Sequence, residues 1–279
     1  TASSRQEKPG RPREVLLAVV LPLIRAPVRL LVRLGVNPLW IVVVHAACAA
    51  LAAWFIFLGP AWWPAAGVLL LIRMLLDNID GAVARGSGSV TVAGRYLDTG
   101  LDLVTNFLLF LALTAVSGTV PALAAFVVLM FLLSYDHCTE TFYAEVRDDS
   151  GTAAASGGPA PGPQAVLVPF RALYAAVLAP QDRLFRRLEL RRFERLAGVP
   201  FASAPVPWQR AWFDRFSGAV TVNTGLSTQS TLLALLLFAG VPHVYVPLVL
   251  LQALLVAGLQ VWRSRRFRNY VRVAVSGAA

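Results

Sequence analysis

Six long apolar segments, each of about 20 residues, follow one another along this chain. This is the length that an α-helix needs to cross the hydrocarbon core of a bilayer. The sequence therefore predicts an all-α integral membrane protein with six transmembrane helices. The predicted spans are residues 38–58, 62–85, 95–117, 119–136, 222–240 and 243–262.

A further apolar segment, residues 14–34, precedes the first predicted span. Arg25, Arg29 and Arg33 are spaced four residues apart in it, which places them on one stripe of a helix whose other positions are mostly Leu and Val. This pattern is typical of an amphipathic helix that lies in the membrane interface. Because these arginines follow the apolar run 15–24 and no small-residue cleavage site does, we do not expect a signal peptide.

The composition agrees with a membrane protein. Of the 279 residues, 57% are hydrophobic and 14% are charged, whereas a soluble domain carries about 25% charged residues. The net charge of +10 comes from basic residues gathered in 1–33, 73–95, 147–215 and 263–272. Basic groups separated by apolar spans are what the positive-inside rule predicts for cytoplasmic segments, so we expect both termini in the cytoplasm of a cell-membrane protein. We interpret the basic charge as contact with anionic membrane lipids and expect no nucleic-acid partner.

These patterns divide the chain into four parts. Residues 1–34 are the basic N-terminus with its amphipathic helix, 35–146 contain four spans, 147–215 form a basic cytoplasmic insert, and 216–279 contain two spans and a basic tail. The insert opens with a linker rich in Gly, Pro, Ser and Ala and continues with basic, amphipathic, aromatic segments. We expect the insert either to lie on the membrane as an appendage or to form a lid over the active site.

Four aspartates stand out in the second and third spans, because Asp77, Asp80, Asp98 and Asp102 are the only acidic residues between 15 and 135. A carboxylate at membrane depth costs on the order of 2.5 kcal/mol or more. The first two are three residues apart and the last two are four apart, so each pair shares one helix face. A short connection lets the two helices pack antiparallel. We therefore expect all four carboxylates to converge near the cytoplasmic surface.

Converging carboxylates repel one another unless divalent cations lie among them. Oxygen ligands favour Mg²⁺, Mn²⁺ or Ca²⁺ over Zn²⁺, and such a cluster could hold two ions, the arrangement used for phosphoryl displacement. The alternative is a set of ion pairs with Arg73, Arg85 and Arg95, which is weaker because burial of an ion pair rarely offsets its desolvation cost.

Two glycines, Gly81 and Gly94, lie beside the acidic pairs within apparently helical segments. Glycine costs about 1 kcal/mol relative to alanine in a helix interior. These positions indicate either close packing of small residues between helices or room for a base or a phosphate against the backbone.

The aspartates belong to a longer pattern, D-x2-D-G-x2-A-R-x8-G-x3-D-x3-D, which covers 26 residues. Every position of this pattern resembles the signature of the CDP-alcohol phosphotransferase (CDP-alcohol phosphatidyltransferase) family. Eight residues at fixed spacings make the match highly specific, and the predicted architecture outside the insert is similar too. The residues are Asp77, Asp80, Gly81, Ala84, Arg85, Gly94, Asp98 and Asp102.

The resemblance implies an enzyme of phospholipid biosynthesis that transfers a substituted phosphate group from a CDP-activated donor to an alcohol and releases CMP. It implies two divalent ions, Mg²⁺ or Mn²⁺, that bridge the aspartates and the donor pyrophosphate, and a homodimer. Asp102 would be shared between metal binding and deprotonation of the acceptor hydroxyl. Asp77, Asp80 and Asp98 would be the principal metal ligands, and Gly81, Ala84, Arg85 and Gly94 would line the nucleotide and phosphate site.

The acceptor alcohol is less clearly indicated. We expect transfer from CDP-diacylglycerol to a polar alcohol; the alternative is transfer of a CDP-bound head group, such as ethanolamine or choline, to a lipid alcohol. No Lys or Arg lies in 96–146 or 216–262 to bind an acceptor phosphate. Asp136, His137 and Glu140 could contact a cationic or polyhydroxylated acceptor, or they form an ordinary polar helix end.

Two histidines in the predicted spans give no clear sign of a functional role, and three alternative functions fit the sequence less well than the family does. His45 and His243 lack a partner pattern, and we expect them to be structural. An intramembrane prenyltransferase would keep its acidic motifs farther apart, and a cation transporter would need polar residues across the whole membrane. A catalytically idle lipid-binding scaffold would not be expected to retain the whole motif.

Overall fold

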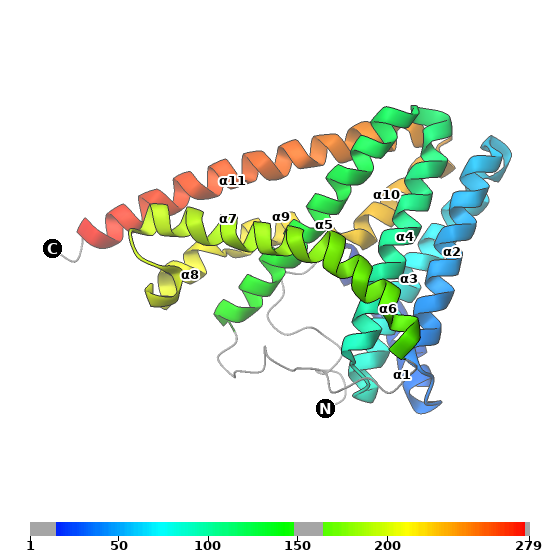
Figure 1. Cartoon of the computed structure of the whole chain (residues 1–279), viewed down its shortest axis with the longest axis horizontal. Helices are drawn as coiled ribbons and strands as arrows, with labels where there is room; N and C mark the ends of the chain where they lie inside the picture. Colours follow the sequence, from blue (N-terminus) through cyan, green and yellow to red (C-terminus); the bar gives the residue numbers. More distant parts are fainter. Residues whose placement is uncertain (1–14, 148–163, 277–279) are drawn as a thin grey trace.

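The computed structural model describes residues 15–147 and 164–276, and every regular element within these residues is a helix (Figure 1). Except for its last residue, the predicted linker 150–164 lies outside the described residues. The elements before it are α1 (Val15–Arg33), α2 (Pro38–Leu58), η1 (Pro60–Trp62), α3 (Trp63–Ser87), α4 (Val92–Ser117) and α5 (Thr119–Arg147). Those after it are α6 (Gln164–Leu173), the π-helical η3 (Tyr174–Leu178), α7 (Ala179–Ala197), η4 (Phe201–Ser203), α8 (Val206–Trp212), α9 (Arg215–Val222), α10 (Leu226–Phe238), η5 (Pro242–Val244) and α11 (Tyr245–Ser276).

Local sequence explains where the helices begin and end. Asn37 caps α2 by accepting a hydrogen bond from the Leu39 N–H at 3.0 Å, and Pro38 occupies the first helical position, where no intrahelical N–H bond is lost. Gly88 ends α3 with a φ of +69°, a left-handed conformation that glycine adopts without steric cost. Thr91 then caps α4 by accepting from the Gly94 N–H at 3.0 Å. The connection between the two aspartate-bearing helices is therefore only four residues long.

Within the described ranges, four helical segments are long and apolar enough to cross a membrane: α2, α4, α5 and Pro242–Ala274, which comprises η5 and most of α11. The predicted all-helical membrane architecture is confirmed to this extent. The helix expected over 62–85 is present as α3, but charged residues interrupt its apolar sequence. Its crossing of the bilayer, and with it the full set of six spans, stays a prediction.

The helix predicted over 222–240 is present as α10 (Leu226–Phe238) but is shorter than we expected. α9 ends at Val222 and α10 begins at Leu226, with Gly225 in an extended conformation between them. The 13 residues of α10 reach about 20 Å, short of the roughly 30 Å hydrocarbon core. The polar sequence Asn223–Thr224–Gly225, which we placed inside a span, instead ends one helix and starts the next.

The central bundle places α2 against both α3 and α4, and α10 against α3 (Figure 1). Its core is built from small and aliphatic side chains such as Ala52, Leu70 and Leu113, all fully buried. α1 is helical where we expected an amphipathic helix, and Val20, Ile24 and Val28 pack it against α3. Its position in the membrane interface stays a prediction.

The insert packs on the bundle through several of its helices. α7 lies along α5 and α11, where Phe193, Trp212 and Phe267 form a second, aromatic core (Figure 1). α6 contacts α4, where a Cβ placed on Gly100 would lie 2.4 Å from the Phe170 ring. The described part of the insert is thus bound to the body of the protein.

Candidate metal centre

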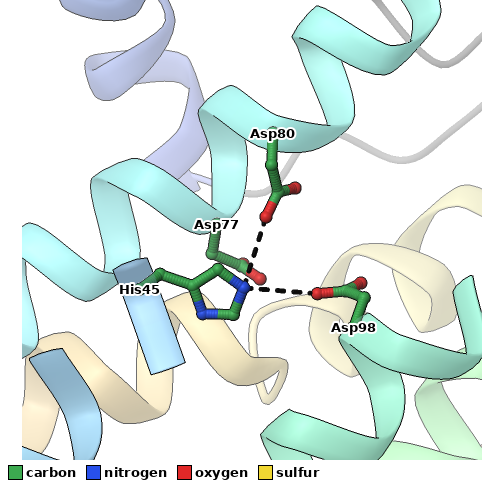
Figure 2. A group of neighbouring side chains, drawn as sticks. All are labelled: His45, Asp77, Asp80 and Asp98. Atoms are coloured by element: carbon green, nitrogen blue, oxygen red, sulfur yellow. Dashed lines mark ion pairs between the residues drawn. The ribbon is translucent and has the colours of Figure 1, made fainter. Parts of the chain in front are cut away.

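The turn between α3 and α4 brings the two aspartate pairs together at the same end of the bundle. Asp77 and Asp80 lie on the last turns of α3, and Asp98 lies near the start of α4. Their carboxylates point toward one another across the two helices, and His45 of α2 points into the same space (Figure 2). One ligand atom from each of these four residues lies within 4.8 Å of the other three.

The four-residue cluster, His45, Asp77, Asp80 and Asp98, is partly buried and contains carboxylate oxygens that accept no hydrogen bond. His45 and Asp80 are buried, and Asp77 and Asp98 are half-buried. Asp80 Oδ2 and Asp98 Oδ1 have no hydrogen-bond partner among the described residues. Buried carboxylate oxygens without a donor carry a large desolvation cost. Three carboxylates and an imidazole at this separation fit a divalent cation, which would supply the missing positive charge.

Asp102 is not one of these four residues and is paired with an arginine. Its Oδ1 accepts a hydrogen bond from Arg73 Nη2 at 2.9 Å, and Arg73 Nη1 donates to Asn106 Oδ1 at 3.1 Å. The Arg73 side chain is 2% exposed. The ion-pair alternative considered for the motif therefore holds for this one aspartate, because Arg73 of α3 reaches across to α4 and fixes the carboxylate.

The other motif residues lie near the turn. A Cβ on Gly81 would be 3.1 Å from Arg85 Nη1, so the Arg85 guanidinium lies back over Gly81, one helical turn earlier. A Cβ on Gly94 would be 3.1 Å from Thr91 Oγ1 and 3.5 Å from Leu39 of α2. Ala84 is half-buried on the same helix as Arg85. Both glycines thus permit close approaches within the chain, and the nucleotide-binding role of these residues stays a prediction.

The three residues predicted for the acceptor site, all on α5, are separated by the structure. Asp136 is half-buried, and its Oδ2 would lie 3.2 Å from a Cβ on Gly225, at the start of α10. Glu140 is half-buried one turn further along α5, while His137 is exposed on another side of that helix. Asp136 therefore faces the break between α9 and α10, where hydroxyl and amide side chains gather.

His45 is the residue that sequence reasoning missed. We expected it to be structural and without a partner, but Nε2 lies 3.3 Å from Asp80 Oδ2 and 3.4 Å from Asp98 Oδ1 (Figure 2). One signal could have found it: α2 contains no Asp, Glu, Lys or Arg, and an isolated ionisable residue inside a membrane span is by default a candidate functional residue.

The comparisons with known proteins agree with this motif. A family model described as CDP-alcohol phosphatidyltransferase matches residues 35–189, more than half of the chain. The chain belongs to this family. The matched range contains the four-residue cluster and Asp102, and it extends into the insert as far as Glu189.

Individual relatives match shorter parts of the chain. The inner membrane protein YnjF of Escherichia coli is 40% identical over 85 residues, which are 30% of this chain and 40% of the relative. Archaetidylinositol phosphate synthase of Aeropyrum pernix is 43% identical over 63 residues, 23% of this chain and 30% of the relative. The synthase of the same name from Pyrococcus horikoshii is 27% identical over 129 residues, 44% of this chain and 67% of the relative. The matches thus span less than half of the first two relatives, and no solved structure matches the chain.

Proposed function

We propose that this protein transfers a phosphatidyl group from CDP-diacylglycerol to the hydroxyl of a polar alcohol and releases CMP. The observation that carries the proposal is the convergence of the carboxylates of Asp77, Asp80 and Asp98 in a member of the CDP-alcohol phosphatidyltransferase family. Asp102 lies one turn after Asp98 on α4. Divalent ions bound there would neutralise the donor pyrophosphate and stabilise the CMP leaving group.

Each motif residue has a distinct part in the proposed reaction. Asp77, Asp80 and Asp98 hold the metal, and a second ion would also need Asp102 as a ligand. Arg85 presents a planar set of donors to a phosphate group near the N-terminal turn of α4.

Asp102 takes the proton of the attacking hydroxyl. Arg73 holds its Oδ1, and we assign the other oxygen to the proton transfer. Because a general base must lie within hydrogen-bond reach of the proton it removes, the Arg73 contact positions Asp102 for the acceptor. Asp136, on the neighbouring α5, lies where a polyhydroxylated acceptor could be bound by hydrogen bonds.

The membrane supplies the setting of the reaction. The donor is a lipid, so its diacylglycerol part stays in the bilayer while its CDP part enters the site between α2, α3 and α4. We propose that this end of the bundle and both termini face the cytoplasm, because apolar spans separate the basic segments of the sequence, the pattern that the positive-inside rule predicts for cytoplasmic segments. We also propose a homodimer, as the family resemblance implies.

The proposal is tested by CMP release from purified protein in detergent, with CDP-diacylglycerol, Mn²⁺ or Mg²⁺ and a panel of alcohols. Inositol phosphate belongs in the panel because two relatives are named archaetidylinositol phosphate synthase. Free inositol, glycerol phosphate and serine complete it. We expect metal-dependent CMP release with one acceptor, and loss of that release in Asp102→Asn but not in Glu194→Gln, which removes an exposed carboxylate of α7.

The outcomes separate the parts of the proposal. CMP release only from CDP-ethanolamine or CDP-choline with diacylglycerol would reverse the assignment of donor and acceptor. Unchanged turnover in Asp102→Asn would remove Asp102 as the base. No CMP from any CDP donor with any acceptor would overturn the activity itself.

A further inference from the structure

His45 is a fully buried polar group on a helix that is otherwise apolar. Its exposed fraction is 0%, and α2 carries no charged side chain. A buried imidazole without hydrogen bonds is unfavourable because it has left the water that would satisfy it. The residue therefore needs a partner that outweighs this cost.

The ring is aimed at the carboxylates and forms ion pairs with Asp80 and Asp98, but without the geometry of a hydrogen bond. Neither nitrogen of His45 has a hydrogen-bond partner among the described residues. Nε2 is the nitrogen that faces the cluster, at 3.3 Å from Asp80 Oδ2 and 3.4 Å from Asp98 Oδ1 (Figure 2). A histidine that only packs in a core usually gives one ring N–H to a carbonyl or a hydroxyl. This one offers Nε2 to a space bounded by oxygen ligands.

The separations are those of ion pairs in the metal-free chain, and they also suit atoms that share one metal ion. Ligands bind such ions at about 2.1 Å, so two ligands at right angles lie about 3 Å apart. The distances from Nε2 to both carboxylate oxygens are close to this value. Asp102, the fourth aspartate of the motif, is meanwhile held by Arg73 outside the cluster. The fourth ligand atom of the group is a nitrogen, where an all-aspartate site would have an oxygen.

We propose that His45 Nε2 is a direct ligand of the bound metal, and that this nitrogen makes the site prefer a first-row transition ion such as Mn²⁺ to Mg²⁺. Imidazole suits transition ions, whereas Mg²⁺ prefers oxygen ligands and keeps several of its waters. The inference rests on the proposed metal site and adds the chemical class of its ion. Because the inference concerns metal binding, the experiments that test it do not require enzymatic activity.

The direct test is pulsed electron paramagnetic resonance of Mn²⁺ bound to the detergent-solubilised protein, purified without a histidine tag. The chain contains three histidines, so the variant His137→Gln/His243→Gln leaves His45 as the only one. We expect a ¹⁴N hyperfine coupling on bound Mn²⁺ that changes to a ¹⁵N coupling when histidine is ¹⁵N-labelled. Should that double variant fail to fold, the same isotope substitution in the wild-type chain shows whether a histidine nitrogen is coupled to the bound Mn²⁺.

The second test compares metal affinities of the wild-type chain and His45→Gln, whose amide oxygen reaches about as far as Nε2. Removing a residue that hydrogen-bonds to a metal ligand lowers metal affinity about 10- to 100-fold. Removing the nitrogen ligand itself should therefore weaken Mn²⁺ binding by at least that factor. Mg²⁺ affinity should change much less, and the Mn²⁺-to-Mg²⁺ preference should fall accordingly. His243→Gln, at an exposed position of η5, is the matched control.

Bound Mn²⁺ without any histidine coupling would overturn the inference, as would an unchanged ion preference in His45→Gln. Either result would mean that the imidazole only offsets the charge of the carboxylates. Failure of the proposed function is recognised separately, because a histidine coupling on bound Mn²⁺ can be observed in a protein that releases no CMP.

Discussion

Two polar clusters in this protein differ in charge balance: the first has more carboxylates than basic groups, and the second pairs one carboxylate with one guanidinium. In the first, at the junction of α2, α3 and α4, three carboxylates surround one imidazole, and Asp80 Oδ2 and Asp98 Oδ1 lack a hydrogen bond within the described residues. In the second, between α5, α7, α8 and α11, the single carboxylate of Glu189 is matched by the guanidinium of Arg263.

The second cluster is complete around its carboxylate. Glu189 is 2% exposed, and its oxygens accept hydrogen bonds from Tyr135 Oη at 3.3 Å and Trp212 Nε1 at 3.1 Å as well as from Arg263. The Arg263 guanidinium also lies 4.2 Å from the centre of the Trp212 ring, a cation–π contact. One charge from the insert and one from α11 therefore join the insert to the bundle.

From this contrast we expect the second cluster to serve the fold and the first to serve a ligand. A buried charge pair with its hydrogen bonds in place fixes how helices pack, and removing one partner is costly. Carboxylates that outnumber the basic groups near them, and that accept no hydrogen bond, raise the free energy of the metal-free fold. Such an arrangement is typical of a site where a cation binds. The two clusters should therefore respond in opposite directions to the same kind of substitution.

The largest expected effect is on catalysis in the first cluster. Asp80→Asn should lower CMP release about 1,000-fold, the scale expected when a preorganised electrostatic group is removed from an active site. Its metal-free thermal stability in detergent should stay equal to wild type or rise, because one of the repelling carboxylates is gone. A large loss of metal-free stability would contradict the assignment of this cluster to a ligand.

The reverse is expected for the second cluster. Glu189→Gln leaves Arg263 buried without its counter-charge and should lower the free energy of unfolding by about 3–5 kcal/mol, measured by denaturant titration in detergent. CMP release per folded molecule should not change. Adding Arg263→Gln should recover part of the lost stability, and a purely additive double variant would show that the two residues are not coupled.

A third effect distinguishes the clusters by their response to metal. Mn²⁺ at 100 times its dissociation constant should stabilise the wild-type chain by about 2.7 kcal/mol, and chelation should reverse the gain. Asp77→Asn/Asp98→Asn should lose this response, whereas Glu189→Gln should keep it from its lower baseline. The measurement is thermal unfolding with and without chelator, and a metal response that survives in the aspartate variant would place the ion elsewhere.

The smallest effect concerns the contact of the insert beside the first cluster. Gly100→Ala would place a Cβ 2.4 Å from the Phe170 ring. Because Phe170 is half-buried and can move aside, we expect a cost of about 1 kcal/mol, the low end for overpacking. Gly258→Ala, where no atom lies within 4 Å of the new Cβ, is the control and should be neutral or stabilising. A cost that persists in Gly100→Ala/Phe170→Ala would show that the α6 contact is not its cause.

Local spacing in the sequence was sufficient for most of the helices and for the acidic motif. Asp77 and Asp80, and likewise Asp98 and Asp102, share a helix face because their spacings match the helical repeat, whatever the rest of the chain does. The short polar connection between them required an antiparallel turn. The family membership followed from the same residues, and the matching family model confirmed it.

Other features depended on how helices pack. His45 joins the cluster only because α2 packs against both α3 and α4, and no local pattern encodes that contact. Arg73 could have paired with several aspartates; the register between α3 and α4 directs it to Asp102. We interpreted the insert as a basic appendage or a lid, because its many arginines gave no sign that its acidic residues Glu189 and Asp214 pair with arginines of α11.

The sequence by itself thus determined the class of protein, the family and three of the four residues of the candidate metal site, since these depend on composition and on spacings within one or two helices. Only the tertiary structure decided that a nitrogen joins the three carboxylates, that Asp102 is held by Arg73, and that the helix of the predicted fifth span begins only at Leu226. The physical reason is the same in each case: these outcomes arise from contacts between helices distant in sequence, whose geometry no local periodicity specifies.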